Sequence, residues 1–546
     1  MRRSITALAL LFSVLAARTL PAAAAQQAEA NRYELRGAVI NSGTGEGISG
    51  ALVEGYFPDR RVQFSGSDGS FVFEDIPRGR YSIAARKPGF FNQAELGQWN
   101  AGFKSMRTVP ADAEVIVKLT PEAIIYGDVT NEDGAAVERI TVKAERWQTE
   151  DGRSQLEVAG NTATDDQGNF RIAELRPGTY YLRFESVNRG GRRNYFELQR
   201  NNAKEQGYGT EFYPGVADRA SASAIAVRAG AQVHVTQIMS KLRLFEISGI
   251  IHGAGPESGV NLNLNNEEGD MAQSSVHFDA KTGEFQMPGI PPGMYVLSAT
   301  AWSQRGNGVQ SQRETSSALL PIHVHSDISG LNLTLGPGIS VRVVVHDERS
   351  HGETTINGNL VFVRMISKEF PQITQAVSAP SPERLGRGPA KFSGLMPEVY
   401  SVEATTNQWG YVAALQCGEV NLLRDDMIVG AGTAPPPIEA TLRDDGAQLN
   451  LTVAENGEPV AANVVVFSEE KPKASLLIRT NETGQVSTGS VAPGTYEVIA
   501  LENAEDLEFR NPAAMQKYLG QASTVTLGPG DKVSVKVEVQ KEGGQQ

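Results

Sequence analysis

Ile76-Pro77-Arg78-Gly79-Arg80-Tyr81 is one of five copies of a phrase that decides the fold. An apolar residue and a Pro-containing pair lead to Gly, one variable residue and Tyr, and an alternating apolar strand follows. The copies recur roughly every one hundred residues, so the repeating unit is a domain and not a solenoid turn. The copies end at Tyr81, Tyr180, Tyr295, Tyr400 and Tyr496.

Each phrase is predicted to be a structural corner. Pro fixes φ and stops the preceding strand, and Gly permits a close approach or a positive φ. The Tyr ring is expected to be buried while its hydroxyl bonds to backbone a few residues upstream, as in a tyrosine corner. A binding role for the five tyrosines is the less favoured alternative. The predicted corner residues are Gly79, Tyr81, Gly178, Tyr180, Gly293, Tyr295, Tyr400, Gly494 and Tyr496.

The fourth copy departs from this pattern because Glu398 replaces the Gly. Its corner must therefore avoid positive φ or be strained. Four copies also have a polar turn ending in Gly ahead of the corner strand, as in Asp68-Gly69 before Phe71. The strand after each Tyr alternates apolar and polar residues, so one face is buried and the other solvated.

The fold expected from these repeats is all-β, with tandem Greek-key β-sandwich (prealbumin-like) modules. Closing strands run directly into the next opening strands, so a semi-rigid rod is predicted. Asn511-Pro512 predicts a short helix that ends near Gly520. The predicted modules are residues 33–120, 121–242 with a loop insertion at 188–214, 243–336, a divergent 337–443, and 444–541.

The N-terminus has the features of a signal peptide. Arg2 and Arg3 precede a short apolar stretch, and Ala23–Ala25 fits a cleavage site, so residues 1–25 are predicted to be removed. The protein is expected to be exported, whether periplasmic, cell-surface or extracellular, with no membrane span after cleavage. A net charge of −13 argues against nucleic-acid binding. Cys417 is the only cysteine, which excludes an intramolecular disulfide and suggests a buried apolar role.

Several motifs of the first copy resemble the carboxypeptidase regulatory-like domain. They are Arg36-Gly37-Ala38-Val39, Ile48–Val53, Asp68–Phe71 and the corner through Tyr81. This domain is related to the transthyretin-like module and the collagen-adhesin B-type repeat, which are small Greek-key sandwiches. Copies two, three and five resemble it through the turn and the corner, and copy four does so weakly. The arrangement is similar to multi-module exported proteins of soil bacteria such as acidobacteria.

The sequence offers no familiar catalytic constellation. It contains no HExxH pair, no Gly-x-Ser-x-Gly elbow and no phosphate-binding loop ahead of a helix. His323 and His325 share one face of a predicted strand, but solvent-facing histidines are favoured over a metal site. We therefore expect no enzyme activity, no cofactor and no metal.

Aromatic residues in connecting segments are the most suggestive functional feature. The favoured hypothesis is a structural or interaction scaffold, adhesion-like, that meets a protein or glycan at the cell envelope. The alternative is carbohydrate binding by ring stacking on starch-binding-like sandwiches. Burial of these rings at sandwich ends and junctions is the more common outcome. The candidate ligand-binding aromatics are Trp99, Tyr208, Tyr213, Trp302 and Trp409.

Overall fold

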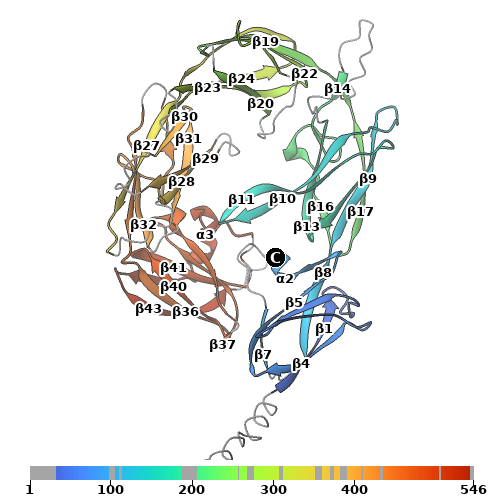
Figure 1. The fold of residues 1–546 in the computed structure, drawn as a ribbon, viewed down its shortest axis with the longest axis vertical. Coiled ribbons are helices and arrows are strands. Elements are labelled where there is room, and N and C mark those ends of the chain that lie inside the picture. The colour runs from blue at the N-terminus through green and yellow to red at the C-terminus, as the bar shows by residue number, and fades with distance from the viewer. Residues whose placement is uncertain are drawn as a thin grey trace, which may run out of the picture. The chain divides into compact units, whose positions relative to one another are not determined.

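The described residues of the computed structural model form five β-sandwiches, numbered here in chain order (Figure 1). It divides into two compact units: residues up to Ile125 with Ala173–Gly178 and Ala226–Val233, and the remainder. No helix in the described ranges is long and apolar enough to cross a membrane. The predicted signal peptide, Trp99 and Trp409 lie outside these ranges. The structure describes residues 32–96, 105–109, 114–186, 206–255, 258–266, 276–305, 312–350, 359–368, 374–380, 390–406, 410–430, 434–481, 483–502, 504 and 506–540.

Sandwich 1 has one sheet in the order β4-β1-β8-β6 and another in the order β3-β2-β5-β7. Alternate residues of these strands meet in one core that includes Leu35, Val53, Phe71 and Ile83. The elements are β1 (Arg32–Asn41), β2 (Leu52–Tyr56), β3 (Arg60–Phe64), β4 (Ser70–Pro77), β5 (Gly79–Arg86), β6 (Phe90–Asn92), α2 (Gln93–Leu96), β7 (Ser105–Val109) and β8 (Val115–Pro121).

Sandwich 2 has sheets in the orders β11-β10-β13-β15, with β16 beside β13, and β12-β9-β17. A separate pair, β14-β18, uses part of the predicted insertion. The elements are β9 (Ala123–Asn131), β10 (Ile140–Glu150), β11 (Arg153–Ala163), β12 (Asn169–Leu175), β13 (Gly178–Ser186), β14 (Gln206–Tyr208), β15 (Glu211–Phe212), η1 (Arg219–Ser221), β16 (Ile225–Val227), β17 (Gln232–Met239) and β18 (Lys241–Arg243).

Sandwich 3 has sheets in the orders β21-β22-β19-β25 and β20-β23-β24-β26. Its core includes Ile247, Phe285 and Leu297. The elements are β19 (Phe245–His252), β20 (Gly259–Asn266), β21 (His277–Phe278), β22 (Glu284–Ile290), β23 (Gly293–Arg305), β24 (Gln312–Val324), β25 (Ile328–Thr334) and β26 (Gly336–Pro337).

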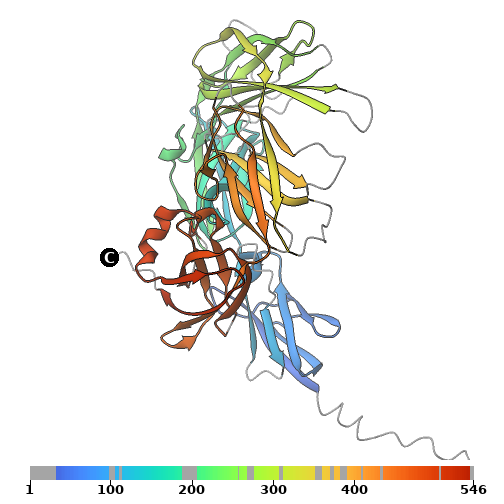
Figure 2. The ribbon, with the colours of Figure 1, turned by 90° about the vertical axis from the view of Figure 1, so that its left-hand side faces the viewer.

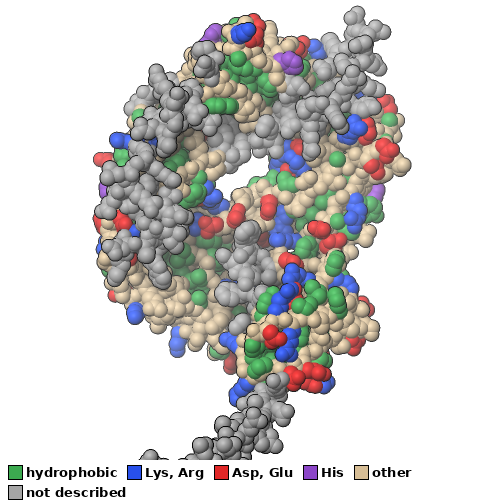
Figure 3. All heavy atoms as spheres, viewed as in Figure 1, with side chains coloured by type: hydrophobic (Ala, Val, Ile, Leu, Met, Phe, Trp, Pro, Cys, Tyr) green, Lys and Arg blue, Asp and Glu red, His purple; other side chains and the backbone are tan. Residues whose placement is uncertain are grey.

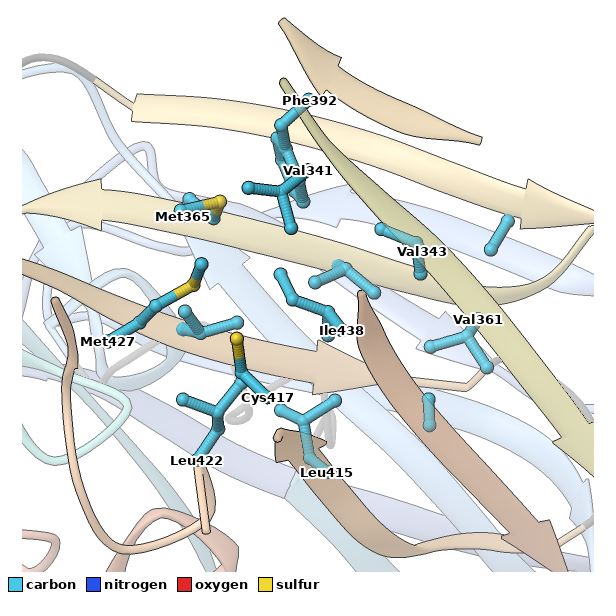
Figure 4. Close-up of a cluster of buried hydrophobic side chains, with 14 of the residues drawn as sticks. Val341, Val343, Val361, Met365, Phe392, Leu415, Cys417, Leu422, Met427 and Ile438 are labelled. Atoms are coloured by element: carbon cyan, nitrogen blue, oxygen red, sulfur yellow. The ribbon is translucent and has the colours of Figure 1, made fainter. Parts of the chain in front are cut away.

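Sandwich 4 has sheets in the orders β30-β27-β35-β32-β33 and β29-β28-β31-β34. Cys417 lies in its core beside Leu415, Leu422 and Ile438 (Figure 4), and burial raises the pKa of its thiol. The elements are β27 (Ile339–Asp347), β28 (Asn359–Ser367), β29 (Thr374–Pro380), β30 (Lys391–Leu395), β31 (Val399–Thr405), β32 (Tyr411–Cys417), β33 (Val420–Asn421), β34 (Met427–Ile428) and β35 (Ile438–Arg443).

Sandwich 5 joins its strands in the order β37-β36-β43-β41-β38-β39, with β40 beside β36 and β42 beside β41. The predicted helix is confirmed as α3, capped by the Asn511 side chain, and it covers one side of the sandwich (Figure 2). The elements are β36 (Ala447–Glu455), β37 (Glu458–Pro459), β38 (Asn463–Phe467), η2 (Pro472–Ala474), β39 (Leu476–Arg479), β40 (Gln485–Val491), β41 (Gly494–Leu501), α3 (Pro512–Leu519), β42 (Ser523–Leu527) and β43 (Lys532–Gln540).

The opening and closing strands of a sandwich lie side by side and run parallel. The parallel pairs are β1 with β8, β19 with β25, β27 with β35, and β36 with β43. The other strand pairs around them are mostly antiparallel, so these sheets are mixed. The parallel pair explains why each closing strand leads directly into the next sandwich.

A second shared feature is a left-handed residue just before each corner. At this position of the five sandwiches, φ is positive at Asp75 (58°), Glu174 (57°), Gly289 (77°), Gly394 (73°) and Ser490 (55°). In sandwiches 1, 3, 4 and 5 the strand register shifts at this place, because two residues face one on the opening strand. This is the geometry of a β-bulge with a left-handed residue, which bends the strand into the corner.

In sandwiches 3, 4 and 5 the corner tyrosine donates a hydrogen bond from its hydroxyl to a carbonyl four residues upstream. Tyr295 donates to the Pro291 carbonyl at 3.1 Å, Tyr400 to Met396 at 3.3 Å and Tyr496 to Ala492 at 2.7 Å. Tyr180 is fully buried, whereas Tyr81 is half-buried and packs edge-on against Phe57. Burial raises the pKa of Tyr295 and of Tyr496 to about 12.

The glycines of the corners adopt nearly extended backbone. Gly178, Gly293 and Gly494 have φ of 158°, 157° and 155°. At Gly79 a Cβ would lie 2.7 Å from the Tyr81 hydroxyl, so the ring excludes a side chain there. Glu398, which replaces this Gly in sandwich 4, is not among the described residues with positive φ, and its carboxylate accepts a hydrogen bond from Ser367 at 2.6 Å.

Candidate functional site

The candidate site is the outer face of the β10–β13 sheet in sandwich 2. Val142 and Leu182 point into the core, so strand alternation places Lys143 and Arg183 on the opposite face. These two residues are direct cross-strand partners, and Glu145 and Glu185 follow on the same outer face. The sequence therefore arranges alternating charges across two neighbouring strands.

The charged side chains form a continuous ionic row. Lys143 contacts Glu185 at 2.6 Å, Arg183 contacts Glu185 at 2.5 Å, and Arg183 approaches Glu145 at 3.4 Å. Arg219, from the 3-10 helix that follows the insertion, pairs with the other oxygen of Glu145. Glu145 and Arg183 are almost fully buried, although both lie on the face that would ordinarily meet solvent.

The segment around residues 211–219 accounts for part of this burial. Phe212 of β15 lies opposite Arg183 in the strand register and is buried. The Arg219 guanidinium lies 4.9 Å from the centre of the Phe212 ring. Because removing charges from water costs several kcal/mol each, such a row is stable only when every charge has an opposite neighbour. The row therefore fixes this segment against the sheet.

Glu211, the neighbour of Phe212 in β15, is hydrogen-bonded to β17 and to the residue after it. Its carboxylate accepts hydrogen bonds from Ser240 N and Gln237 Nε2, both at 3.0 Å. Burial raises the pKa of Glu211, and these two hydrogen bonds oppose that shift. The described end of the predicted insertion is thus a packed part of sandwich 2.

An exposed apolar patch lies next to the ionic row. Trp147 follows Glu145 on the same face of β10 and is 54% exposed. Val158, the cross-strand partner of Glu145, is 43% exposed, and Leu156 lies opposite Trp147. A Trp on the solvent side of a strand, beside Val and Leu, is typical of an interaction surface. We call Trp147, Leu156 and Val158 the Trp147 patch.

Sequence reasoning missed Trp147 because it considered aromatics in connecting segments and not those in strands. The available signal was alternation. Ile140, Val142 and Ala144 mark the buried face of β10, so Trp147 falls on the polar face with Lys143. An apolar ring on a polar face is the informative exception.

The predicted aromatics that the structure describes belong to two different sandwiches. Tyr208 is half-buried in β14, and Tyr213 is half-buried after β15. Trp302 belongs to sandwich 3, where it is half-buried and lies over Gly259, since a Cβ there would be 2.5 Å from the ring. Trp99 and Trp409 lie outside the described residues, as does the first part of the insertion.

Sandwich 3 has a shallow depression of about 530 Å³ on its β21-β22-β19-β25 sheet. His277, Gln286 and Ser248 form a row across three strands there, because the register places them directly opposite one another. Glu246 and Glu284 add negative charge to its walls. The depression is open and polar, and it has no exposed aromatic platform among its described lining residues.

The paired histidines lie at the end of β24. The ring centres of His323 and His325 are 5.3 Å apart, and both residues are exposed. No group of three or more His, Cys, Asp or Glu side chains with metal-binding geometry occurs in the described ranges. Acidic and basic side chains are interspersed over the described part of the face in Figure 3.

Comparison with known proteins supports the domain type. Residues 124–206, in sandwich 2, match the carboxypeptidase regulatory-like domain. A search of curated proteins finds no match. Together with the repeated sheets, the matched domain defines a tandem β-domain protein.

Solved structures of pilins are similar at low scores. The minor pilin GBS52 of Streptococcus agalactiae is 13% identical, and the match covers 38% of this chain and 96% of that one at a TM-score of 0.20. The shaft pilin SpaA of Lactobacillus rhamnosus GG is 10% identical, with coverage of 38% and 97% and a TM-score of 0.19. The major pilin BcpA of Bacillus cereus is 9% identical, with coverage of 76% and 99% and a TM-score of 0.14. Likeness at this level carries no argument about function.

Proposed function

We propose that the protein is an exported, non-catalytic scaffold whose sandwich 2 binds a protein partner through the Trp147 patch. The exposed Trp147 on a strand face is the observation that carries this proposal. Trp and Arg are enriched in the centres of protein interfaces, and the partly exposed Arg219 lies in the neighbouring ionic row. The partly exposed Lys143 and Arg219 of that row offer a partner a charged border beside this apolar anchor.

The ion pairs that immediately precede Trp147 in β10 support the same proposal. Lys143 and Glu145 precede Trp147 on one face of one strand, and their ion pairs hold that face in register. An anchor on a held strand loses less conformational entropy on binding than one on a free loop. The site is thus suited to recognition and offers no nucleophile–base pair for catalysis among its described residues.

Photo-cross-linking of the full chain tests this proposal. Benzoylphenylalanine at position 147 should give a discrete adduct with an envelope protein of the producing cell, and excess unmodified chain should suppress it. Excess Trp147→Ser chain should not suppress it. The matched control places the same group at Phe64, which is 70% exposed in sandwich 1. Equal adduct patterns at positions 64 and 147 would refute a specific site at Trp147.

Carbohydrate binding is the second candidate, favoured by the ring of Trp302 lying over the Gly259 backbone. A ring supported on one side by backbone is held flat, as stacking on a sugar requires. A glycan array with the full chain and its Trp302→Ala variant tests it. Binding that disappears in the variant supports the candidate, and silence of the unmodified chain across the array refutes it.

A further inference from the structure

The β10–β11 hairpin extends beyond the sheet that supports it (Figure 1). β10 pairs with β13 from Ile140 to Glu145, and from Arg146 onward it pairs, among the described strands, with β11 alone. The turn at its end has positive φ at Asp151 (49°) and Gly152 (75°), which is the type I′ pattern of a tight hairpin. An isolated two-stranded ribbon is marginally stable in water, so its end needs support from elsewhere.

The end of the hairpin has that support within its own compact unit. Gly152 is buried, and a Cβ on it would lie 2.9 Å from two ring carbons of Phe509 in sandwich 5. The Asp151 carboxylate pairs with the Arg510 guanidinium at 2.7 Å. Arg153 pairs with Glu403 on β31 of sandwich 4. We call Asp151–Arg153 the hairpin tip.

The surface that receives the tip is fixed by contacts of its own. Phe509 is buried in a small core with Met515 of α3, and Arg510 lies over the Phe509 ring at 5.6 Å. Glu403 is held by Arg364, its cross-strand neighbour, at 2.7 Å. The receiving groups are therefore positioned by sandwiches 4 and 5 and not by the tip.

The charges match in a reciprocal way. The tip presents an acid and, two residues later, a base, and the receiving surface presents a base and an acid. Burial, together with the nearby Arg510 and Arg364, lowers the pKa of Arg153 to about 10. Burial also lowers the pKa of Arg510. The Arg153 and Arg510 side chains are 30% and 17% exposed, so both cations are only partly accessible to water.

We propose that Glu403, Phe509 and Arg510 form a receptor surface for the hairpin tip of the same chain. Two ion pairs and one glycine–ring contact make this a small interface, and the tip can leave it without unfolding a core. The receptor recognises an acid-Gly-base turn, since the Gly admits the ring and the flanking charges select the orientation. This inference does not depend on the Trp147 patch binding a partner.

Distance measurement between spin labels in the full chain tests the receptor. Labels are placed at Glu157→Cys on the hairpin and Gln516→Cys on α3, both exposed positions, in a Cys417→Ala background. The unmodified tip should give a narrow, short distance distribution. Asp151→Lys should reduce that population at least tenfold, because it places a like charge against Arg510. Asp166→Lys, on an exposed turn of the same sandwich, is the matched control and should change nothing.

A charge exchange separates direct pairing from damage to the fold. Arg510→Glu alone should also remove the short distance, and Asp151→Lys with Arg510→Glu should restore it. A short distance that survives either single change would overturn the proposal, and so would failure of the double variant to restore it. Dilution of labelled chains with excess unlabelled chain should leave the distance unchanged, and its loss would overturn pairing within one chain.

Discussion

The left-handed residue before each corner leads to a prediction with opposite signs in two sandwiches. An L-residue in this conformation costs about 1–2 kcal/mol relative to right-handed backbone, a cost that Gly avoids. Glu174 bears that strain with an exposed side chain, so Glu174→Gly loses no burial. The larger unfolded-state entropy of Gly returns about 0.4–1 kcal/mol of the gain. We expect Glu174→Gly to stabilise sandwich 2 by about 0.5–1 kcal/mol.

The reverse change is expected to be harmful in sandwich 4. Gly394 has a φ of 73°, which an L-residue rarely adopts. The backbone there is also crowded, because a Cβ added to Gly338 would lie 2.2 Å from the Gly394 Cα. Gly394→Ala should therefore destabilise sandwich 4 by about 1 kcal/mol. For a domain of this size that is a change of about 4–8 °C in Tm.

Calorimetry of the full chain, with hydrogen exchange to assign each transition to its sandwich, measures both effects. Glu157→Gly is the matched control for Glu174→Gly, because Glu157 is an exposed strand residue outside the positive-φ set. It should destabilise its strand by about 0.5–1 kcal/mol. A destabilising Glu174→Gly, or a neutral Gly394→Ala, would refute the argument from backbone strain.

Three further outcomes follow from the corners and the ionic row. Tyr496→Phe should cost about 1 kcal/mol in urea unfolding, and Tyr81→Phe, whose hydroxyl bonds to no described residue, should cost almost nothing; equal losses would contradict the corner mechanism. Tyr295 and Tyr496 have pKa values raised to about 12, so they keep their protons in the folded chain while unfolded tyrosines ionise near pH 10. Their contribution to the free energy of unfolding is therefore complete below pH 10 and should fall by up to about 1.4 kcal/mol per tyrosine per pH unit between pH 10 and 12. A stability curve that stays flat over this pH range would contradict the burial of these hydroxyls. Glu145→Gln should destabilise sandwich 2 by about 2 kcal/mol, because it removes the buried carboxylate shared by Arg183 and the partly exposed Arg219, although Arg183 keeps Glu185, whereas Glu34→Gln in an exposed pair should stay within about 0.5 kcal/mol; denaturant titration that finds the two alike would contradict the buried row.

The sequence was sufficient to predict the all-β tandem fold because its strongest signals are local. Pro and Tyr in a fixed spacing, followed by alternation, specify a corner and a half-buried strand without knowledge of the remainder. The helix after Asn511 was equally predictable from its cap and its Pro. The bulge was missed because Glu174 and Ser490 belong to residue types that rarely adopt positive φ, so the five positions share no common residue signal.

The candidate site was harder to predict because it depends on what covers a sheet. Lys143, Glu145 and Arg183 look like ordinary solvent-facing residues of alternating strands. Their burial follows from a return of the chain at Phe212 and Arg219, many residues later, which no local pattern encodes. Trp147 was within reach of the alternation rule, because it falls on the polar face of a strand whose other face is Ile140, Val142 and Ala144.

The parallel pairing of opening and closing strands has a mechanical consequence. Tension applied to the two ends of a sandwich pulls these neighbours along their lengths in opposite directions. The hydrogen bonds between them are then sheared together and do not open one after another. In sandwich 5 this ladder runs from Gln448 to Ala454, longer than the Gly37–Asn41 ladder of sandwich 1. Single-molecule stretching of the full chain should find that sandwich 5 ruptures at a higher force than sandwich 1.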